Sequence, residues 1–342
     1  MKTVEIDQLM RYLADEKTPL AVAQLYRLTD LSEGELARFR HLWLQIPAKR
    51  RSQVIGFLIE IAESNFEVNF EAIFCACLDD IDQEVRTRAV DGLWESEDAA
   101  LIAPLLRMAQ DDPAPIARAA AAAALGRFVL LGELGKLPSR RQAEIEDVLL
   151  ALINSPQESV KVQRRAVEAV AYSGRKEILK IIEDAYHRPE RLMRVSAVFA
   201  MGRNMDPQWN PLLLEELQNP DPEFRYEAAR ACGELELKSA VSQLSKLLTD
   251  SDREVQEVSI WALGQIGGEQ ARQILETRRE IAAQDDEALR EAIEDALDEI
   301  DLAAGTVEFS LYEYDLDIDD QDPDWIKDWI GGSDDYDIND DY

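Results

Sequence analysis

Few residues of this chain could form a catalytic or metal centre. Its 342 residues include two histidines, His41 and His187, and three cysteines, Cys75, Cys77 and Cys232. One residue separates Cys75 from Cys77, which points the two thiols to different faces of a helix, and no second cysteine pair completes a zinc site. Two imidazoles are also too few for a histidine-rich metal centre. We therefore predict no catalytic residues, no metal and no cofactor.

Aspartates dominate the end of the chain. Residues 306–342 hold fourteen acidic side chains, and Lys327 is their one basic residue. Asp315, Asp317 and Asp319 alternate as calcium ligands can, but the segment lacks the glycine and the terminal glutamate of an EF-hand loop. No specific calcium site is predicted.

The same acidic segment contains seven aromatic residues, which is far more than a solvating tail needs. Pro323 precedes two possible helical turns that place Trp325 and Trp329 on one face, beside Ile326 and Ile330. These four apolar residues are the predicted anchor of a segment that is disordered alone and folds on binding. The alternative, that the segment serves solubility only, stays open.

The net charge of −32 limits the classes of partner. A surface this acidic disfavours nucleic acid and anionic membranes. The first residues mix charged and apolar side chains, unlike a secretory signal, and no apolar run reaches membrane-spanning length. With three cysteines and no disulfide framework, a cytoplasmic location is expected.

One motif recurs seven times along the chain. Each copy has a turn with Asp or Pro followed by V-R-x-x-A-x-x-A-L-G or a close variant. The copies begin at Val85, Ala117, Val162, Met193, Phe224, Val255 and Leu289, with spacings of 32, 45, 31, 31, 31 and 34 residues. This regularity predicts an array of similar structural units.

Each copy of the motif predicts an amphipathic helix with small residues on the buried stripe. A second amphipathic segment is expected before each copy, as at residues 99–109, 176–186, 211–218 and 240–249. No strand pattern interrupts them. The fold is therefore predicted to be all-α, a right-handed α-solenoid of about seven helix pairs.

The repeat resembles the HEAT repeats, specifically the short subtype first associated with phycobilisome lyases. The resemblance covers roughly residues 66–303, and it predicts three parts: a helical N-terminal cap at 1–65, a solenoid at 66–304 and the acidic-aromatic tail at 305–342. In the cap, Ser32 to Glu35 form a predicted capping box that opens a helix to Ile46, and Pro47 starts another helix to Glu63. The long spacing between the second and third copies predicts a projecting loop at residues 128–142.

The resemblance implies that the second helix of each pair lines the concave side. Motif positions +2, +6 and +10 should then face a groove whose middle is basic and aromatic and whose ends are acidic. The predicted partner-binding residues are Arg127, Arg164, Tyr172, Phe199, Arg203, Tyr226, Arg230, Trp261 and Gln265. Arginine and aromatic side chains are enriched at interface hot spots. The alternative, scattered surface residues on a helical array, stays open.

The motif arginines Arg86, Arg118, Arg194, Arg225 and Arg290 recur at one position of the repeat. Because turn aspartates stand nearby, we expect each arginine to bridge to a turn carboxylate of an adjacent repeat. This role is structural, and it keeps the repeats in register.

A non-enzymatic scaffold, adaptor or assembly protein of the cytoplasm fits these features. Its predicted partners are other proteins, with basic or peptide-like segments, and the tail is a second binding segment or a cover that docks on the groove. The alternative is a bilin (tetrapyrrole) lyase or chaperone-like protein. Deoxyhypusine hydroxylase, which is built from similar repeats, binds di-iron through His-Glu pairs, whereas Leu42 and Arg188 follow the two histidines of this chain.

Overall fold

The computed structural model describes residues 3–281 and 286–305. Within these residues the secondary structure is helical, and no strand occurs. Residues 1–300 form one compact unit, and residues 301–342 are assigned to a second. The division into cap, solenoid and tail stays a prediction. The predicted anchor, Trp325, Ile326, Trp329 and Ile330, lies outside the described residues.

Seven helix pairs follow one another along the first unit, as the motif predicts. The first helices are α5 (Glu71–Cys77), α7 (Ile102–Asp111), α9 (Ser139–Asn154), α11 (Glu177–Tyr186), α13 (Asn210–Glu216), α15 (Val241–Leu247) and α17 (Gly268–Ile281). The second helices are α6 (Gln83–Asp91), α8 (Pro115–Glu133), α10 (Val160–Val170), α12 (Arg191–Asn204), α14 (Pro222–Glu234), α16 (Arg253–Ile266) and α18 (Glu287–Ala303). The predicted all-α solenoid is confirmed.

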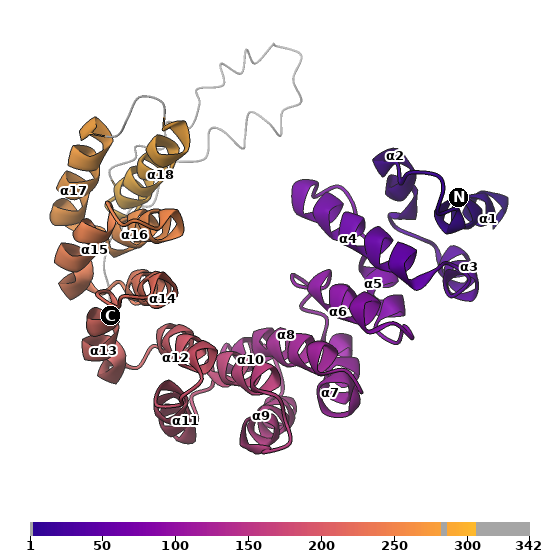
Figure 1. Ribbon diagram of the computed structural model, residues 1–342, viewed down its shortest axis with the longest axis horizontal. Coiled ribbons are helices and arrows are strands. Elements are labelled where there is room, and N and C mark those ends of the chain that lie inside the picture. The colour runs from indigo at the N-terminus through magenta and orange to yellow at the C-terminus, as the bar shows by residue number, and fades with distance from the viewer. Residues whose placement is uncertain (1–2, 282–285, 306–342) are drawn as a thin grey trace, which may run out of the picture. The chain divides into compact units, whose positions relative to one another are not determined.

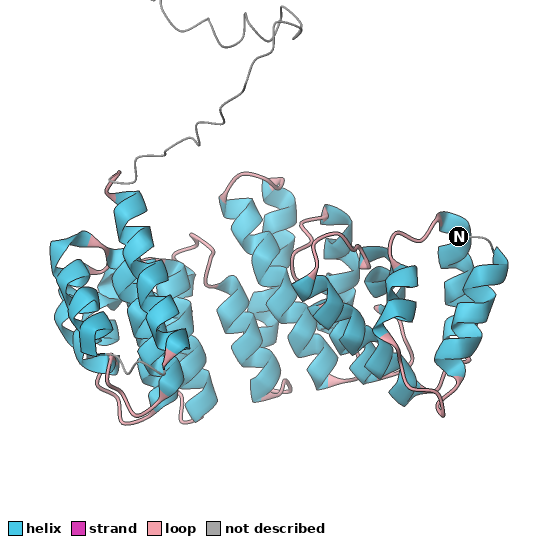
Figure 2. Ribbon diagram, turned by 90° about the horizontal axis from the view of Figure 1, so that it is seen from above, coloured by secondary structure: helices cyan, strands magenta, loops and turns pink. Residues whose placement is uncertain are grey.

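The pairs stack in two layers (Figure 1). The second helices, from α6 to α16, form the inner layer, and α7, α9, α11, α13 and α15 form the outer layer. Seen from above, the helices stand side by side with short connections at their ends (Figure 2). Short turns favour antiparallel neighbours, so each pair buries its apolar stripes against the next pair.

Aspartates cap the second helices at the turns. The Asp82 carboxylate accepts hydrogen bonds from the backbone N–H groups of Glu84 and Val85, at 2.9 and 3.2 Å. Asp221 and Asp252 cap α14 and α16 in the same way. Capping satisfies donors that a helix start would otherwise leave without a partner, which explains why the motif begins with an acidic turn.

The motif glycines allow the second helices of neighbouring pairs to touch. A Cβ atom built on Gly126 would lie 2.9 Å from the Cα of Ala169, and one on Gly233 would lie 2.8 Å from the Cα of Ala262. Gly202 and Gly264 face the next repeat equally closely. Any larger residue at these positions must push the two backbones apart.

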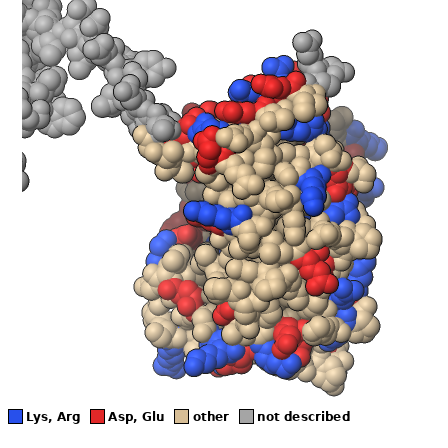
Figure 3. All heavy atoms as spheres, turned by 90° about the vertical axis from the view of Figure 1, so that its left-hand side faces the viewer, with Lys and Arg blue, Asp and Glu red and all other residues tan. Residues whose placement is uncertain are grey.

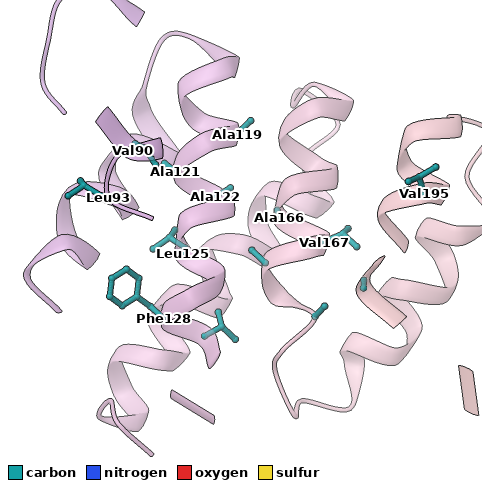
Figure 4. Close-up of a cluster of buried hydrophobic side chains, with 14 of the residues drawn as sticks. Val90, Leu93, Ala119, Ala121, Ala122, Leu125, Phe128, Ala166, Val167 and Val195 are labelled. Carbon is teal, nitrogen blue, oxygen red and sulfur yellow. The ribbon is translucent and has the colours of Figure 1, made fainter. Parts of the chain in front are cut away.

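Buried aliphatic and aromatic side chains fill the space between the layers. Figure 4 shows Leu93, Leu125, Phe128 and Val167 among the alanines of α8 and α10. Leu125 and Phe128 are completely buried, and the cluster continues from pair to pair. One extended core therefore holds the first unit together.

The predicted loop at residues 128–142 is wrong in most of its length. Helix α8 continues to Glu133 and α9 begins at Ser139, so five residues connect them. The additional residues lengthen both helices of this repeat, because apolar side chains such as Val129 and Leu131 continue the buried stripe.

Helix α8 also has the length and hydropathy of a membrane-spanning helix, and it is the one such helix among the described residues. Of its apolar window, 56% is buried inside the protein. This helix is a core element of the solenoid, packed between α7 and α10.

Four helices precede the repeats. They are α1 (Thr3–Ala14), α2 (Val22–Leu25) with a 3-10 turn at Tyr26–Leu28, α3 (Glu33–Trp43) and α4 (Ala48–Ser64). The predicted capping box at Ser32 and Glu35 is present, and Pro47 caps α4. Arg50 donates to the carbonyl oxygens of Leu13 and Thr18, at 3.0 and 2.7 Å, and so holds the end of α1 against α4.

The motif arginines join consecutive turns. Arg86 donates to both carboxylate oxygens of Asp112 in the next repeat, at 2.7 and 2.8 Å, and to the carbonyl oxygen of Asp80 in its own turn, at 2.6 Å. Arg225 binds Asp250 and the carbonyl of Asn219 in the same manner. The predicted bridge to an adjacent turn is confirmed for these two arginines.

The remaining motif arginines divide into three cases. Arg118 also bridges to the next repeat, through Glu158 at 2.9 Å. The prediction is wrong for Arg194, whose guanidinium lies over the rings of Tyr186 and Phe224. Arg191 binds Asp221 in its place. For Arg290 in the last pair, the described residues contain no such bridge.

The bridge extends into the cap, which the sequence motif did not indicate. Arg51 of α4 binds the carboxylate of Asp80, at 2.8 and 3.0 Å, and the carbonyl oxygen of Ile46. Both side chains of this ion pair are almost fully buried. Helices α3 and α4 are thus a divergent repeat joined to the first motif copy by the same contact.

Candidate protein-binding groove

The inner layer contains two pockets that lie next to each other along the helices. The first, here called the α8 pocket, lies among α6, α8, α10 and α12 and has a volume of about 680 Å³. The second, here called the α14 pocket, lies among α12, α14 and α16 and has a volume of about 670 Å³. Pockets of this size suit a few side chains of a bound partner.

The predicted groove residues are divided between these pockets. Arg127, Tyr172 and Phe199 line the α8 pocket. Arg203, Tyr226, Arg230 and Trp261 line the α14 pocket.

Stacked aromatic and guanidinium groups form the wall that the pockets share. The Arg203 guanidinium lies 5.8 Å from the ring centroid of Tyr172 and 5.4 Å from that of Phe199. Arg230 lies 4.3 Å from the Phe199 centroid. Cation–π contacts of this kind hold flat side chains in place and leave their edges for a ligand. The wall makes the two pockets one continuous surface.

Carboxylates neutralise the arginines of the α14 pocket. Arg203 Nη2 lies 3.0 Å from a Glu234 oxygen, and Arg230 Nη2 lies 2.9 Å from Glu227 Oε2. Glu254 and Glu257 line the same pocket, so it has more acidic than basic side chains. At Arg203 and Arg230 the groove is therefore not net basic, because Glu234 lies 3.0 Å from Arg203 and 3.7 Å from Arg230, and Glu254 and Glu257 add further negative charge.

The α8 pocket has the opposite balance. Arg127, Lys161 and Arg165 line it, against Asp91 and Glu168. Arg165 binds Glu168 at 2.5 Å, which removes one charge of each sign. The basic part of the inner surface lies here, and Arg127 is three repeats closer to the N-terminus than Arg230.

Glu227 is the inner-surface carboxyl with the largest upward shift in pKa among the described residues. Burial raises the pKa of Glu227 to about 7, with Glu168, Glu234 and Glu223 acting in the same direction and Arg230 against them. A carboxyl that titrates near neutral pH makes the wall between the pockets sensitive to pH.

Two predicted groove residues line neither pocket. Arg164 donates to the Ser196 hydroxyl at 3.4 Å between α10 and α12, and Gln265 is half-buried at the end of α16. The neighbour of Arg164, Arg165, lines the α8 pocket instead.

Sequence reasoning also missed Trp94 and Lys161, which line the α8 pocket. Trp94 stands at the motif position that is glycine in four other repeats, and this substitution was the available signal. Its side chain is 58% exposed, the largest exposed fraction of any tryptophan among the described residues.

Charges are mixed on the outer face near the end of the array. Figure 3 shows basic and acidic side chains interspersed among uncharged ones on this face. An interspersed surface of this kind favours solubility over the recognition of one charged ligand. This face therefore contrasts with the inner layer, where aromatic and cationic groups gather.

The three cysteines are free, and Cys77 and Cys232 are buried. Burial raises the pKa of Cys75 to about 11 and that of Cys232 to about 12. Both thiols are protonated at neutral pH, which suits packing and opposes metal binding or nucleophilic attack.

Comparison with known families agrees with the repeat architecture. A family model described as HEAT repeats matches residues 210–298, which span α13 to α18. Four further helix pairs, from α5 to α12, precede the matched residues with the same architecture. Residues 210–298 are therefore HEAT repeats.

Two solved structures illustrate what the chain is similar to. The complex of CpcE and CpcF of phycocyanin lyase from Nostoc sp. PCC7120 is 14% identical, with a TM-score of 0.51, and the match covers 84% of this chain and 97% of that chain. Human deoxyhypusine hydroxylase is 20% identical, with a TM-score of 0.34, over 87% of this chain and 96% of that chain. No curated protein matches the sequence. At 14% identity, the likeness to the lyase complex is one of fold alone.

Proposed function

We propose that the inner surface is a protein-binding groove and that the protein is a non-enzymatic scaffold, adaptor or assembly factor. The continuous wall of Tyr172, Phe199, Arg203 and Arg230 between two open pockets is the observation that supports this most strongly. Aromatic and arginine side chains next to pockets are the usual anchors of interfaces.

The tail is proposed as a second binding segment. Its anchor residues, Trp325, Ile326, Trp329 and Ile330, suit a hydrophobic recess, and its aspartates suit cationic side chains. In an autoinhibitory form of this proposal, the tail covers the groove until a basic or peptide-like client displaces it. The proposed compartment is the cytoplasm, without nucleic acid or membrane as partner, in keeping with the net charge of −32.

Affinity capture from an extract of the native cells tests the groove. The wild type is compared with a chain that carries both Trp94→Ala and Trp261→Ala, which removes the two exposed tryptophans of the pockets. A matched control, Ile281→Ala, removes an exposed apolar side chain from the outer helix α17.

Partners that bind the wild type and the control, but not the double variant, would support the groove. Equal recovery with all three chains would refute it. Truncation after Gly305 tests the tail separately, because a covering tail predicts higher recovery of groove partners from the shortened chain.

Tetrapyrrole binding is the second candidate function. An apolar pocket of about 680 Å³ with Arg127, Lys161 and Arg165 at its edges suits a flat apolar molecule that bears carboxylates. Incubation with a bilin, followed by visible absorption spectroscopy, separates the candidates. A shifted spectrum that Arg127→Gln abolishes would favour tetrapyrrole handling over the scaffold.

A further inference from the structure

Arg127 is the starting point, because part of its hydrogen-bonding capacity is unfilled. Its Nη1 donates to the backbone carbonyl of Trp94, and its guanidinium stacks on Phe128 at 4.9 Å. Its Nε and Nη2 atoms are buried and have no acceptor among the described residues. A buried charged donor without a partner is costly, so this edge of the guanidinium favours an incoming acceptor.

Nε and Nη2 form one side of the guanidinium fork, which matches the two oxygens of a carboxylate. The pocket's own carboxylates do not fill this side. Glu168 is bound by Arg165 and by the Ser196 hydroxyl. Burial lowers the pKa of Arg127, although Glu97 and Glu71 act in the opposite direction without an ion pair to it.

Beside this fork the pocket is apolar and open. Ala120, Ala123 and Ala124 line it together with the exposed indole of Trp94 and the side chain of Leu130. Small side chains next to a free aromatic face leave room for a bulky apolar group. The 680 Å³ volume accommodates such a group with part of its backbone.

The opening has a local cause in the repeat. At the same motif position, Gly126, Gly202, Gly233 and Gly264 let the next second helix approach to contact distance. The first repeat has Trp94 there, and α6 ends three residues earlier, at Asp91. The indole therefore stands where close helix packing would otherwise cover the alanines of α8.

We propose that the α8 pocket binds a peptide in which a bulky apolar side chain stands next to an aspartate or glutamate. The apolar side chain packs between Trp94 and the alanines of α8. The carboxylate accepts two hydrogen bonds from Nε and Nη2 of Arg127, and Lys161 attracts further acidic residues at the rim. This proposal rests on the proposed function, and it places an acidic ligand at Arg127 rather than at Arg203 and Arg230.

Fluorescence anisotropy with the full-length protein tests the proposal. The probe is a fluorescein-labelled, acetylated hexapeptide, Asp-Asp-Trp-Ile-Asp-Asp, and its matched control has Asn at all four Asp positions. The wild type should bind the acidic peptide more tightly than the neutral one. Arg127→Gln should weaken binding of the acidic peptide by about tenfold or more, because it removes a charged hydrogen-bonding partner.

Two further variants localise the site. Ala123→Phe fills the pocket from an exposed position and should abolish binding of both peptides. Arg107→Gln removes an exposed arginine from the outer helix α7 and should change the affinity less than about twofold, because Arg107 lines neither pocket. Circular dichroism melts show that each variant is folded before its affinity is compared.

Three results would overturn the proposal: equal affinity for the acidic and neutral peptides, unchanged binding in Ala123→Phe, or equal losses in Arg127→Gln and Arg107→Gln. If the peptide binds only after residues 306–342 are removed, the pocket is assigned to the chain's own acidic segment. That result would also overturn the proposal that a peptide from a partner protein occupies it. If peptide binding fails while partner capture still depends on Trp94 and Trp261, the groove stands and only its ligand is wrong.

Discussion

Two arginines of helix α14, Arg225 and Arg230, have different surroundings although they are only five residues apart on the same helix. Arg225, at the turn, donates to both oxygens of Asp250 and to the carbonyl of Asn219, and the pair is nearly buried. Arg230, on the inner layer, stacks on Phe199, and its Nε makes no hydrogen bond among the described residues. Residue type alone therefore does not identify a binding residue.

The same contrast separates the two faces along the array. Arg86 at the turns has its donors filled by two repeats, whereas the inner Arg127 and Arg203 each keep an unfilled Nε. A filled guanidinium joins repeats, and a partly filled one beside a pocket favours a ligand. Unfilled donors thus distinguish Arg127 and Arg203 from Arg86. Arg118, which bridges to Glu158, also has a buried Nε without a hydrogen bond, so a candidate binding arginine must in addition lie beside a pocket.

The largest expected effect belongs to the turn. Arg225→Met should destabilise the solenoid by about 3–5 kcal/mol, because it leaves the buried Asp250 carboxylate without its partner. Urea unfolding monitored by circular dichroism measures the loss. The double variant Arg225→Met with Asp250→Leu should recover part of it, since no unpaired charge remains. A loss below about 1 kcal/mol would make Arg225 energetically similar to a surface arginine.

The fold was predictable because the residue types at fixed positions of each repeat determine how its helices pack. Alanine, glycine and the capping aspartate recur at fixed positions, and their spacing determines helix, turn and neighbour contact. Gly233 against Ala262 is a direct case, since the close approach requires the small residue that the motif contains. The prediction of a loop at residues 128–142 was wrong because the apolar residues of this segment extend two helices. The spacing between motif copies does not show whether additional residues form a loop or lengthen helices.

The groove was less predictable because it depends on side chains that no motif fixes. Arg164 and Arg165 differ by one step of helical phase, about 100° around the axis, and one of them faces the pocket. The charge of Arg203 and Arg230 depends on Glu234 and Glu227, which pair with them in three dimensions. The α8 pocket depends on Trp94, a residue that follows the end of its helix.

An intermediate effect is expected from pH, and it belongs to the inner surface. Because the pKa of Glu227 is raised to about 7 in the folded protein, the native state binds a proton that the unfolded chain releases near its ordinary pKa of 4.5. The contribution of this carboxyl to stability is therefore greatest below pH 4.5 and is lost as the pH rises through 7. Each unit of pKa difference corresponds to about 1.4 kcal/mol.

Urea midpoints from pH 5 to pH 8 measure this effect as the difference between the wild type and Glu227→Gln. The wild type should lose stability relative to the variant as the pH rises, because the glutamine stays neutral throughout. Asp250 should not contribute to this difference: the Arg225 bridge holds its pKa below the usual 3.8 against the effect of burial, so its contribution is lost only at pH values below this range. Parallel curves for the wild type and Glu227→Gln would contradict the raised pKa.

The smallest effect on stability is expected from Arg203→Gln on the inner layer. The ion pair of Arg203 with Glu234 is partly exposed, and Glu234 keeps Arg230 at 3.7 Å after the change. Partly exposed pairs contribute about 0–1 kcal/mol, so the urea midpoint should move little. A loss as large as that of Arg225→Met would make Arg203 a structural residue, and the inner arginines would then join repeats as the turn arginines do. A small loss of stability in Arg203→Gln would show that folding does not require the Arg203 guanidinium, which is what a role in binding rather than in joining repeats predicts.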